Sequence, residues 1–231
     1  MAGPASTLGV FMTGKEDFGD SGVNVAPFIV FEGIDGVGKT TQLKQLHRWM
    51  EEQYGFPIHL TGEPTNRPIG KLLKRALKRQ VKLDGICQAL LFAADRIDHF
   101  KTEITANIQR GIPVLCDRYY MSSFAYQWRE MPDDLEWIES INARARHPDL
   151  TLLIDAPAEV CMERIRLSRT DTELYEELET LRSIRANYLE LAQRRQPMER
   201  IEVIDGMRSS EEVHKDVCAQ VKEVMTPYCN G

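Results

Sequence analysis

The sequence predicts an α/β fold, a doubly wound sheet of five parallel strands with helices on both faces. Short apolar runs alternate along the chain with longer helical patterns, which is typical of strand–helix–strand units with parallel strands. The runs are continuously apolar rather than alternating in polarity, as expected for strands covered on both faces. The expected strands are Phe28–Phe31, Ile58–Leu60, Ile112–Cys116, Leu150–Ile154 and Ile201–Ile204.

Helices are expected between these strands. Thr41–Gln53 follows the first strand directly, and Asp84–Arg110 and Glu173–Arg195 carry apolar residues at helical spacing. The basic run Lys71–Arg79 also spaces its apolar residues as a helix does, with the charges on the opposite side. We interpret this run as a solvated helix face rather than a nucleic-acid site.

Residues 1–27 differ from the rest of the chain and are predicted to form a disordered or loosely docked tail. They hold five of the 15 glycines and lack the basic start and continuous apolar centre of a secretory signal. Residues 28–231 show no internal repeat and no second core. They are therefore predicted to form a single domain.

Composition and charge argue against several classes of protein. The 231 residues carry 29 basic and 35 acidic side chains, and this net charge of −6 disfavours broad attraction to nucleic acid or to an anionic membrane. No apolar stretch approaches the roughly 20 residues of a membrane span. The cysteines are odd in number and widely spaced, which indicates reduced thiols in a cytoplasmic protein. They are Cys87, Cys116, Cys161, Cys218 and Cys229.

The strongest local signal is a phosphate-binding loop. The pattern G-x-x-x-x-G-K-[ST] directly follows an apolar strand and precedes an amphipathic helix. Backbone N–H groups of such a loop surround phosphate oxygens, Lys39 is expected to reach the β and γ phosphates of ATP, and the Thr40 hydroxyl is expected to ligate Mg²⁺. The predicted ATP-binding residues are Gly33, Ile34, Asp35, Gly36, Val37, Gly38, Lys39, Thr40 and Thr41.

The phosphate loop alone does not identify the reaction. A GTPase would normally carry N-K-x-D, which is absent, and a motor ATPase would end a strand in Asp-Glu. Here two strands end in Asp117-Arg118 and Asp155-Ala156. The first pair suits a small-molecule kinase, because Asp117 can hold a water of the Mg²⁺ shell and the planar guanidinium of Arg118 can bind two oxygens of an acceptor phosphate.

The combined motifs resemble the thymidylate kinase family. The resemblance covers about Phe28 to Val224 and implies the reaction of ATP with dTMP to give ADP and dTDP, a nucleotide kinase with a helical lid, and a homodimer. The motifs that carry it are F-E-G-x-D-G-x-G-K-T-T-Q (31–42), E-P (63–64), L-L-F-x-A-x-R (90–96), D-R-Y-x-x-S-x-x-A-Y-Q (117–127) and R-x-x-Y-L-x-L-A (185–192).

The resemblance also assigns the acceptor site. It implies that Asp35 binds the 3′-hydroxyl of the sugar, that Phe92 stacks on the thymine ring and that Arg96 donates to a thymine carbonyl. From helical spacing alone, Phe92 is more typical of a core residue. Tyr126 matches the position that crowds the 2′ carbon of ribose. The dTMP-binding residues implied are Asp35, Glu63, Phe92, Arg96, Arg118, Ser123, Tyr126 and Gln127.

A lid is expected at about residues 163–176. Some relatives carry an arginine in the phosphate loop after the aspartate, but that position here is Gly36. We therefore expect an arginine of this lid, Arg164, Arg166 or Arg169 with Arg169 as the first candidate, to supply the transition-state charge. The predicted catalytic residues are Lys39, Asp35, Arg118, Arg169 and Arg164.

Two alternatives remain open from the sequence. The first is a kinase of another nucleoside monophosphate or of a deoxynucleoside, and the second is a nucleic-acid-stimulated ATPase. Neither nucleic acid nor a membrane is the expected partner, since the charge balance and the absence of an apolar span disfavour both.

Overall fold

Five strands form one parallel sheet in the order β2-β3-β1-β4-β5. The computed structural model describes residues 25–168 and 174–229. In the register of the sheet, Val30 of the central strand lies between Cys116 and Thr151. The predicted doubly wound fold is confirmed. The strands are β1 (Phe28–Glu32), β2 (His59–Gly62), β3 (Val114–Asp117), β4 (Leu150–Asp155) and β5 (Ile201–Asp205).

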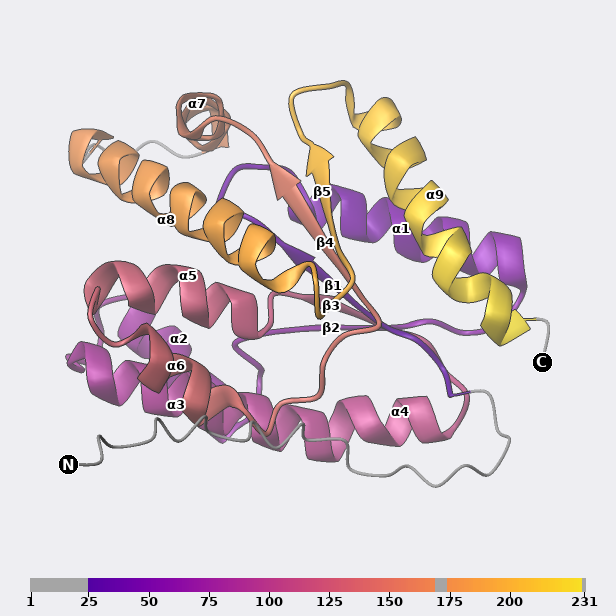
Figure 1. Cartoon of the computed structure of the whole chain (residues 1–231), viewed down its shortest axis with the longest axis horizontal. Helices are drawn as coiled ribbons and strands as arrows, with labels where there is room; N and C mark the ends of the chain where they lie inside the picture. The colour runs from indigo at the N-terminus through magenta and orange to yellow at the C-terminus, as the bar shows by residue number, and fades with distance from the viewer. Residues whose placement is uncertain (1–24, 169–173, 230–231) are drawn as a thin grey trace, which may run out of the picture.

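Helices cover both faces of this sheet. Figure 1 shows α1 and α9 on one side and α5 and α8 on the other. The connections that follow β1 and β3 lead to opposite faces of the sheet, to α1 and α5 respectively. The loops at the carboxyl ends of these two strands therefore separate, and ligands bind at this edge of the sheet in such folds. The helices are α1 (Lys39–Tyr54), α2 (Pro68–Leu77), α3 (Gly85–His99), α4 (Thr105–Gln109), α5 (Tyr120–Glu130), α6 (Leu135–Asn142), α7 (Ala158–Ser168), α8 (Leu174–Arg195) and α9 (Ser210–Cys229).

The predicted helices agree with this arrangement. The stretch Asp84–Arg110 forms α3 and α4, joined by one π-helical segment, η1 (Phe100–Ile104). Asp84 begins it as an N-cap, since its side chain accepts the N–H of Cys87. Helices α5, α6 and α9 were not predicted, and α7 was expected only in part, as the start of the helical lid at about residue 163. Several of them are rich in aromatic, serine or β-branched residues, which have low helix propensity and obscure the pattern.

The core lies on both sides of the central strands. All five residues of β1 and the first five of β4 are buried, as expected for strands covered by helices. At the sheet edges, Leu60 of β2 and Val203 of β5 remain exposed. The rings of Phe28 and Tyr119 meet edge to face, with centroids 5.1 Å apart, and join β1 to the start of α5.

Two predicted segments fall partly outside the described residues. Most of the predicted tail does so, but Ala26 and Pro27 are buried and the carbonyl oxygen of Pro27 accepts the N–H of Val114 at 2.9 Å. The predicted lid is described on both sides of residues 169–173, and Arg169 lies outside the described residues. All five cysteines are free thiols. Among the described helices, none is both long and apolar enough to cross a membrane.

Candidate active site

The phosphate loop joins β1 to α1 at the carboxyl edge of the central strand. β1 ends at Glu32, and α1 begins at Lys39 with Gly38 as its N-cap in the left-handed region (φ 103°). Gly33 requires a glycine, because a Cβ there would lie 2.4 Å from the carbonyl oxygen of Ile154. The loop is therefore held against the sheet, with its N–H groups and the positive end of α1 available to an anion.

Lys39 is folded back over this loop. Its Nζ donates to the carbonyl oxygens of Gly33 at 2.7 Å and Ile34 at 2.9 Å. Burial, together with the positive charge of Arg118, lowers the pKa of Lys39 to about 7. A bound phosphate would favour the charged form and raise that pKa again.

Thr40 and Asp117 bring a hydroxyl and a carboxylate together beside the loop. Thr40 Oγ1 lies 3.4 Å from Asp117 Oδ2. The other carboxylate oxygen of Asp117 is buried and has no hydrogen-bond partner in the described part of the chain. A buried oxygen with spare acceptor capacity beside a hydroxyl fits Mg²⁺, which takes few protein ligands and completes its shell with water and substrate phosphates.

A cavity of about 480 Å³ opens over the phosphate loop. It joins the loop to the end of β3 and to α7, which contributes Arg164. Arg164 donates to the carbonyl oxygens of Val37 at 3.4 Å and Gly206 at 3.1 Å. The residues that line the cavity are Asp35, Gly36, Gly38, Lys39, Thr40, Thr41, Asp117, Arg118, Arg164 and Ile165.

Gly36 lies directly under α7. Its φ is +79°, and a Cβ at this position would lie 2.4 Å from the carbonyl oxygen of Cys161. An arginine at position 36 would therefore clash with the backbone of α7 as well as strain the loop. The packing of α7 therefore leaves no room for an arginine side chain at position 36.

Arg118 is held through both terminal nitrogens of its guanidinium. Nη2 donates to Asp35 Oδ1 at 2.7 Å and to the hydroxyl of Tyr126 at 3.2 Å. Nη1 donates to Ser122 Oγ at 3.1 Å and to the hydroxyl of Tyr188 at 3.2 Å. Arg118 thus lies between the phosphate loop, through Asp35, and the helix α5 that carries the predicted acceptor residues.

The predicted acceptor residues Glu63, Arg96 and Ser123 meet in one buried cluster. Arg96 of α3 donates through Nη2 to Ser123 Oγ at 3.1 Å, and the same nitrogen lies 2.8 Å from Glu63 Oε2. Its Nη1 donates to Asn142 of α6. The Nε of Arg96 has no partner among the described residues. The cluster therefore fixes the guanidinium while one of its donors stays unused.

The remaining acceptor residues border this cluster. Gln127 is buried on α5, and its Oε1 accepts no hydrogen bond within the ranges that the structure describes. Phe92 is half-buried one turn before Arg96 on α3 and is not part of the hydrophobic core cluster. The interpretation of Phe92 as a core residue, drawn from helical spacing alone, is therefore not supported.

The residues that hold these groups in place were not predicted from the sequence. Glu32 lies in an apolar strand and is fully buried, yet it accepts hydrogen bonds from the start of α5 and from Tyr188. Asp95 accepts the N–H and the hydroxyl of Thr65 and so fixes the loop after Glu63. A carboxylate within a buried apolar run was a signal that could have marked Glu32.

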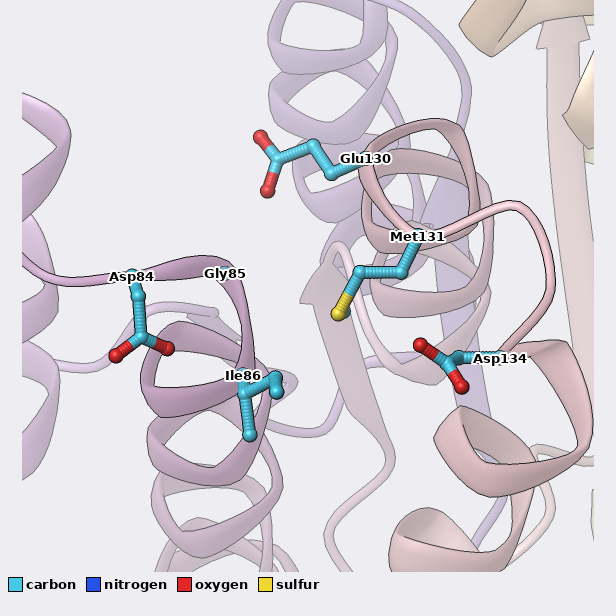
Figure 2. Close-up of a pocket in the computed structure, with 6 residues that line it drawn as sticks. All are labelled: Asp84, Gly85, Ile86, Glu130, Met131 and Asp134. Atoms are coloured by element: carbon cyan, nitrogen blue, oxygen red, sulfur yellow. The ribbon is translucent and has the colours of Figure 1, made fainter.

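A second hollow, of about 350 Å³, lies where α3 begins and α5 ends. Figure 2 shows Asp84 and Ile86 on one side and Met131 and Asp134 on the other. Glu130 adds a third carboxylate to the lining. This negative charge disfavours a phosphorylated ligand, and none of the predicted site residues borders the hollow.

Comparisons with known proteins agree with this geometry. A family model described as thymidylate kinase matches residues 31–217. Among curated relatives, a probable thymidylate kinase of Pyrococcus horikoshii is 42% identical over 200 residues, covering 84% of this chain and 95% of the relative. Another from Thermococcus kodakarensis is 40% identical over 206 residues, covering 86% of this chain and 98% of the relative.

A solved structure shows the same architecture. The crystal structure of thymidylate kinase from Ehrlichia chaffeensis superimposes with a TM-score of 0.68 at 26% identity, covering 85% of this chain and 99% of that chain. The same family is indicated by the phosphate loop, by Asp117-Arg118 at the end of β3 and by the similarity along most of the chain. The chain belongs to the thymidylate kinase family.

Proposed function

We propose that the chain transfers the γ-phosphoryl group of ATP to the phosphate of dTMP in the cavity over the phosphate loop. Phosphorylation of dTMP to dTDP is the activity of the family to which the chain belongs. One observation carries the assignment of roles: Lys39 and Thr40, on the donor side, line the same cavity as Arg118, which faces the acceptor residues. Two phosphorylated reactants can therefore meet head to head within one positively charged site.

The residues act by positioning and by charge. Lys39 binds the β and γ phosphates, and Arg118 binds the acceptor phosphate while Asp35 accepts the sugar 3′-hydroxyl. An oxygen of the acceptor phosphate attacks the γ phosphorus in line, and ADP leaves with the electron pair. No covalent enzyme intermediate is required, because phosphoryl transfer is catalysed mainly by orientation and electrostatic stabilisation.

Mg²⁺ would be held by Thr40 directly and by Asp117 through water. When bound, the cation neutralises charge that develops on the phosphates. The spare acceptor capacity of Asp117 and its proximity to the Thr40 hydroxyl support this assignment. In the described residues, no cluster of three acidic, histidine or cysteine side chains offers a competing metal site.

The acceptor base is proposed to lie between α3 and α5. Phe92 supplies a ring for stacking and Arg96 donates to a thymine carbonyl. The Oε1 of Gln127, which has no partner among the described residues, can accept from the base edge. Tyr126 excludes a ribose 2′-hydroxyl. The thymine methyl contributes only about 1–3 kcal/mol of discrimination, so we expect dUMP to be a poor substrate rather than an inactive one.

A coupled assay of ADP release tests the proposed function. Purified protein with Mg²⁺ and ATP should release ADP with dTMP, weakly with dUMP, and not with dCMP, dGMP or thymidine. Release of ADP on addition of DNA alone would instead indicate a nucleic-acid-stimulated ATPase. Failure to convert dTMP, with the ATP site shown to be occupied, would contradict the assignment.

Binding of ATP should take up a proton at alkaline pH. Lys39 has a pKa of about 7 in the free protein, and the phosphates of ATP raise it, so Lys39 gains a proton when ATP binds. At pH 8 we expect uptake approaching about one proton per ATP and an affinity that falls as pH rises above 7; at pH 6 the uptake should nearly vanish. Calorimetry in buffers of different ionisation enthalpy measures this number.

The variant Lys39→Arg is the matched control for proton uptake. Arginine keeps its charge across this pH range, so the variant should bind ATP without taking up a proton. Equal uptake in the variant would show that another group titrates.

The lid arginines should affect turnover more than ATP affinity. We expect Arg164→Ala or Arg169→Ala to lower kcat by about 10³-fold for the arginine that contacts the transferring group, because its charge acts mainly in the transition state. Arg164 already lines the cavity. The exposed Arg166, on the same helix, is the control and should tolerate alanine. Near-normal kcat in both test variants would contradict a catalytic lid.

We also propose a cytoplasmic homodimer. Free thiols at all five cysteines support a reducing compartment. Leu77 of α2 and Ile86 and Leu90 of α3 are large, exposed apolar side chains, which supports a contact between two copies at these helices.

A further inference from the structure

Arg118 has a backbone conformation that its own sequence does not explain. Its φ is +68°, in the left-handed region that a non-glycine residue rarely adopts. Such a conformation costs on the order of 1 kcal/mol or more and persists only where neighbouring groups enforce it. On its N-terminal side, the N–H of Arg118 donates to the carbonyl oxygen of Phe31 at 2.9 Å. A second constraint acts on the peptide that follows.

That second constraint is the fully buried carboxylate of Glu32. Its Oε1 accepts the N–H of Tyr119 at 2.8 Å, which belongs to the peptide directly after Arg118. The same oxygen accepts the N–H of Ser122 at 3.1 Å. Tyr119 is the N-cap of α5 and makes no capping bond of its own, so Glu32 caps this helix from the neighbouring strand.

The other oxygen of Glu32 organises the side chain of Arg118. Oε2 accepts the hydroxyls of Ser122 at 2.6 Å and Tyr188 at 2.9 Å, and these two hydroxyl oxygens lie 2.8 Å apart. Each hydroxyl has one proton, which it donates either to Glu32 or to the other hydroxyl, which in turn donates to Glu32. Their lone pairs are thereby left to Arg118, whose Nη1 lies within 3.2 Å of both.

We propose that Glu32 is a positioning residue for the acceptor phosphate, acting through Ser122 and Tyr188 to orient the guanidinium of Arg118. This proposal rests on the proposed function and extends it. Burial raises the pKa of Glu32, while the hydroxyls of Ser122 and Tyr188, the N–H of Tyr119 and the Arg118 charge act in the opposite direction. The carboxylate is the acceptor in all four contacts, so the hydroxyl protons of Ser122 and Tyr188 point away from Arg118.

The variant Glu32→Gln separates this role from general support of the fold. The amide has nearly the same shape but lacks the charge, and its NH₂ group requires acceptors where the carboxylate has donors. The hydroxyls of Ser122 and Tyr188 would then turn their protons toward Arg118. We expect the Kd for dTMP to rise about tenfold or more and the Kd for thymidine, which has no phosphate, to change less than about twofold. Calorimetric titration measures both constants.

Two further variants test the same hydrogen bonds to Arg118. Tyr188→Phe removes one hydroxyl while retaining the buried ring, and should raise the dTMP-to-thymidine ratio of Kd values about fivefold even if Glu32→Gln does not fold. In an Arg118→Met background, Glu32→Gln should not change this ratio further, because both substitutions act on the same guanidinium.

Glu199→Gln is the matched control. Glu199 is also buried and accepts the hydroxyl of Tyr120 at 2.6 Å, so its loss should lower stability without changing the ratio. Equal weakening of dTMP and thymidine in the Glu32 and Tyr188 variants, or an unchanged ratio, would overturn the positioning role while wild-type turnover persists. Absence of dTMP phosphorylation by the wild type would contradict the proposed function and this inference with it.

Discussion

Arg118→Met should lower kcat/KM for dTMP by at least about 10³-fold while leaving the Kd for ATP within about threefold. A phosphate can accept from Nη2 of the guanidinium by replacing Asp35 and Tyr126 as acceptors, and hydrogen bonds to charged groups contribute about 1.5–3 kcal/mol each. Methionine retains much of the buried volume but removes the charge and all the donors. Steady-state kinetics with varied dTMP, and ATP titration by calorimetry, measure the two quantities.

Two controls define the origin of this loss. Arg118→Lys retains a positive charge but not the two-pronged geometry, so its kcat/KM should lie between those of the wild type and Arg118→Met. Arg146→Met removes a half-buried arginine that pairs with Asp149 away from the cavity, and it should remain active. Near wild-type kcat/KM in Arg118→Met would mean that another cation binds the acceptor phosphate.

The phosphate loop is the part of the site that is predicted best from the sequence, because its residues are contiguous in the chain. The phosphate loop spans Gly33–Thr41, and each of its chemical groups follows from the local strand–loop–helix pattern. The strands were predicted for a related reason: parallel strands covered on both faces are continuous apolar runs, so β1 and β4 could be located within a residue or two. Local pattern and tertiary burial coincide in these segments.

What could not be predicted depends on partners far apart in the chain. Glu32 receives hydrogen bonds from residues 87, 90 and 156 positions later. Its sequence context, an apolar strand, indicates only burial. The pairing of Arg96 with Glu63 and Asn142 likewise joins three separate elements. Such contacts depend on the topology of the sheet, which composition and periodicity limit but do not specify.

The fold also supplies a physical reason for a departure noted in the sequence. Gly36 stands where some relatives carry an arginine, and the carbonyl oxygen of Cys161 occupies the space that a Cβ would need. The same helix that excludes a side chain there brings Arg164 to the cavity. The position of α7 on the phosphate loop therefore excludes an arginine at position 36 and brings Arg164 to the cavity.

Lys39→Met should lower kcat by about 10³-fold or more and weaken ATP binding as well. Lys39 is buried beside the carbonyl oxygens of Gly33 and Ile34 in the phosphate loop, and it lines the cavity where the β and γ phosphates are proposed to bind. Methionine has a similar length and tolerates burial, so the loop can keep its position without the charge. Single-turnover measurement of dTDP formation at saturating ATP separates the loss of chemistry from the loss of affinity.

Binding of dTMP provides the internal reference for this variant. Arg118 and the cluster of Arg96 with Glu63 remain intact, so the Kd for dTMP should change less than about twofold while single-turnover chemistry collapses. Lys44→Met, an exposed lysine on the same helix, should behave as the wild type. A Lys39→Met enzyme with near-normal chemistry at saturating ATP would show that backbone N–H groups and the lid suffice for the donor phosphates. The division of the cavity into a lysine-bound donor side and an arginine-bound acceptor side would then be wrong.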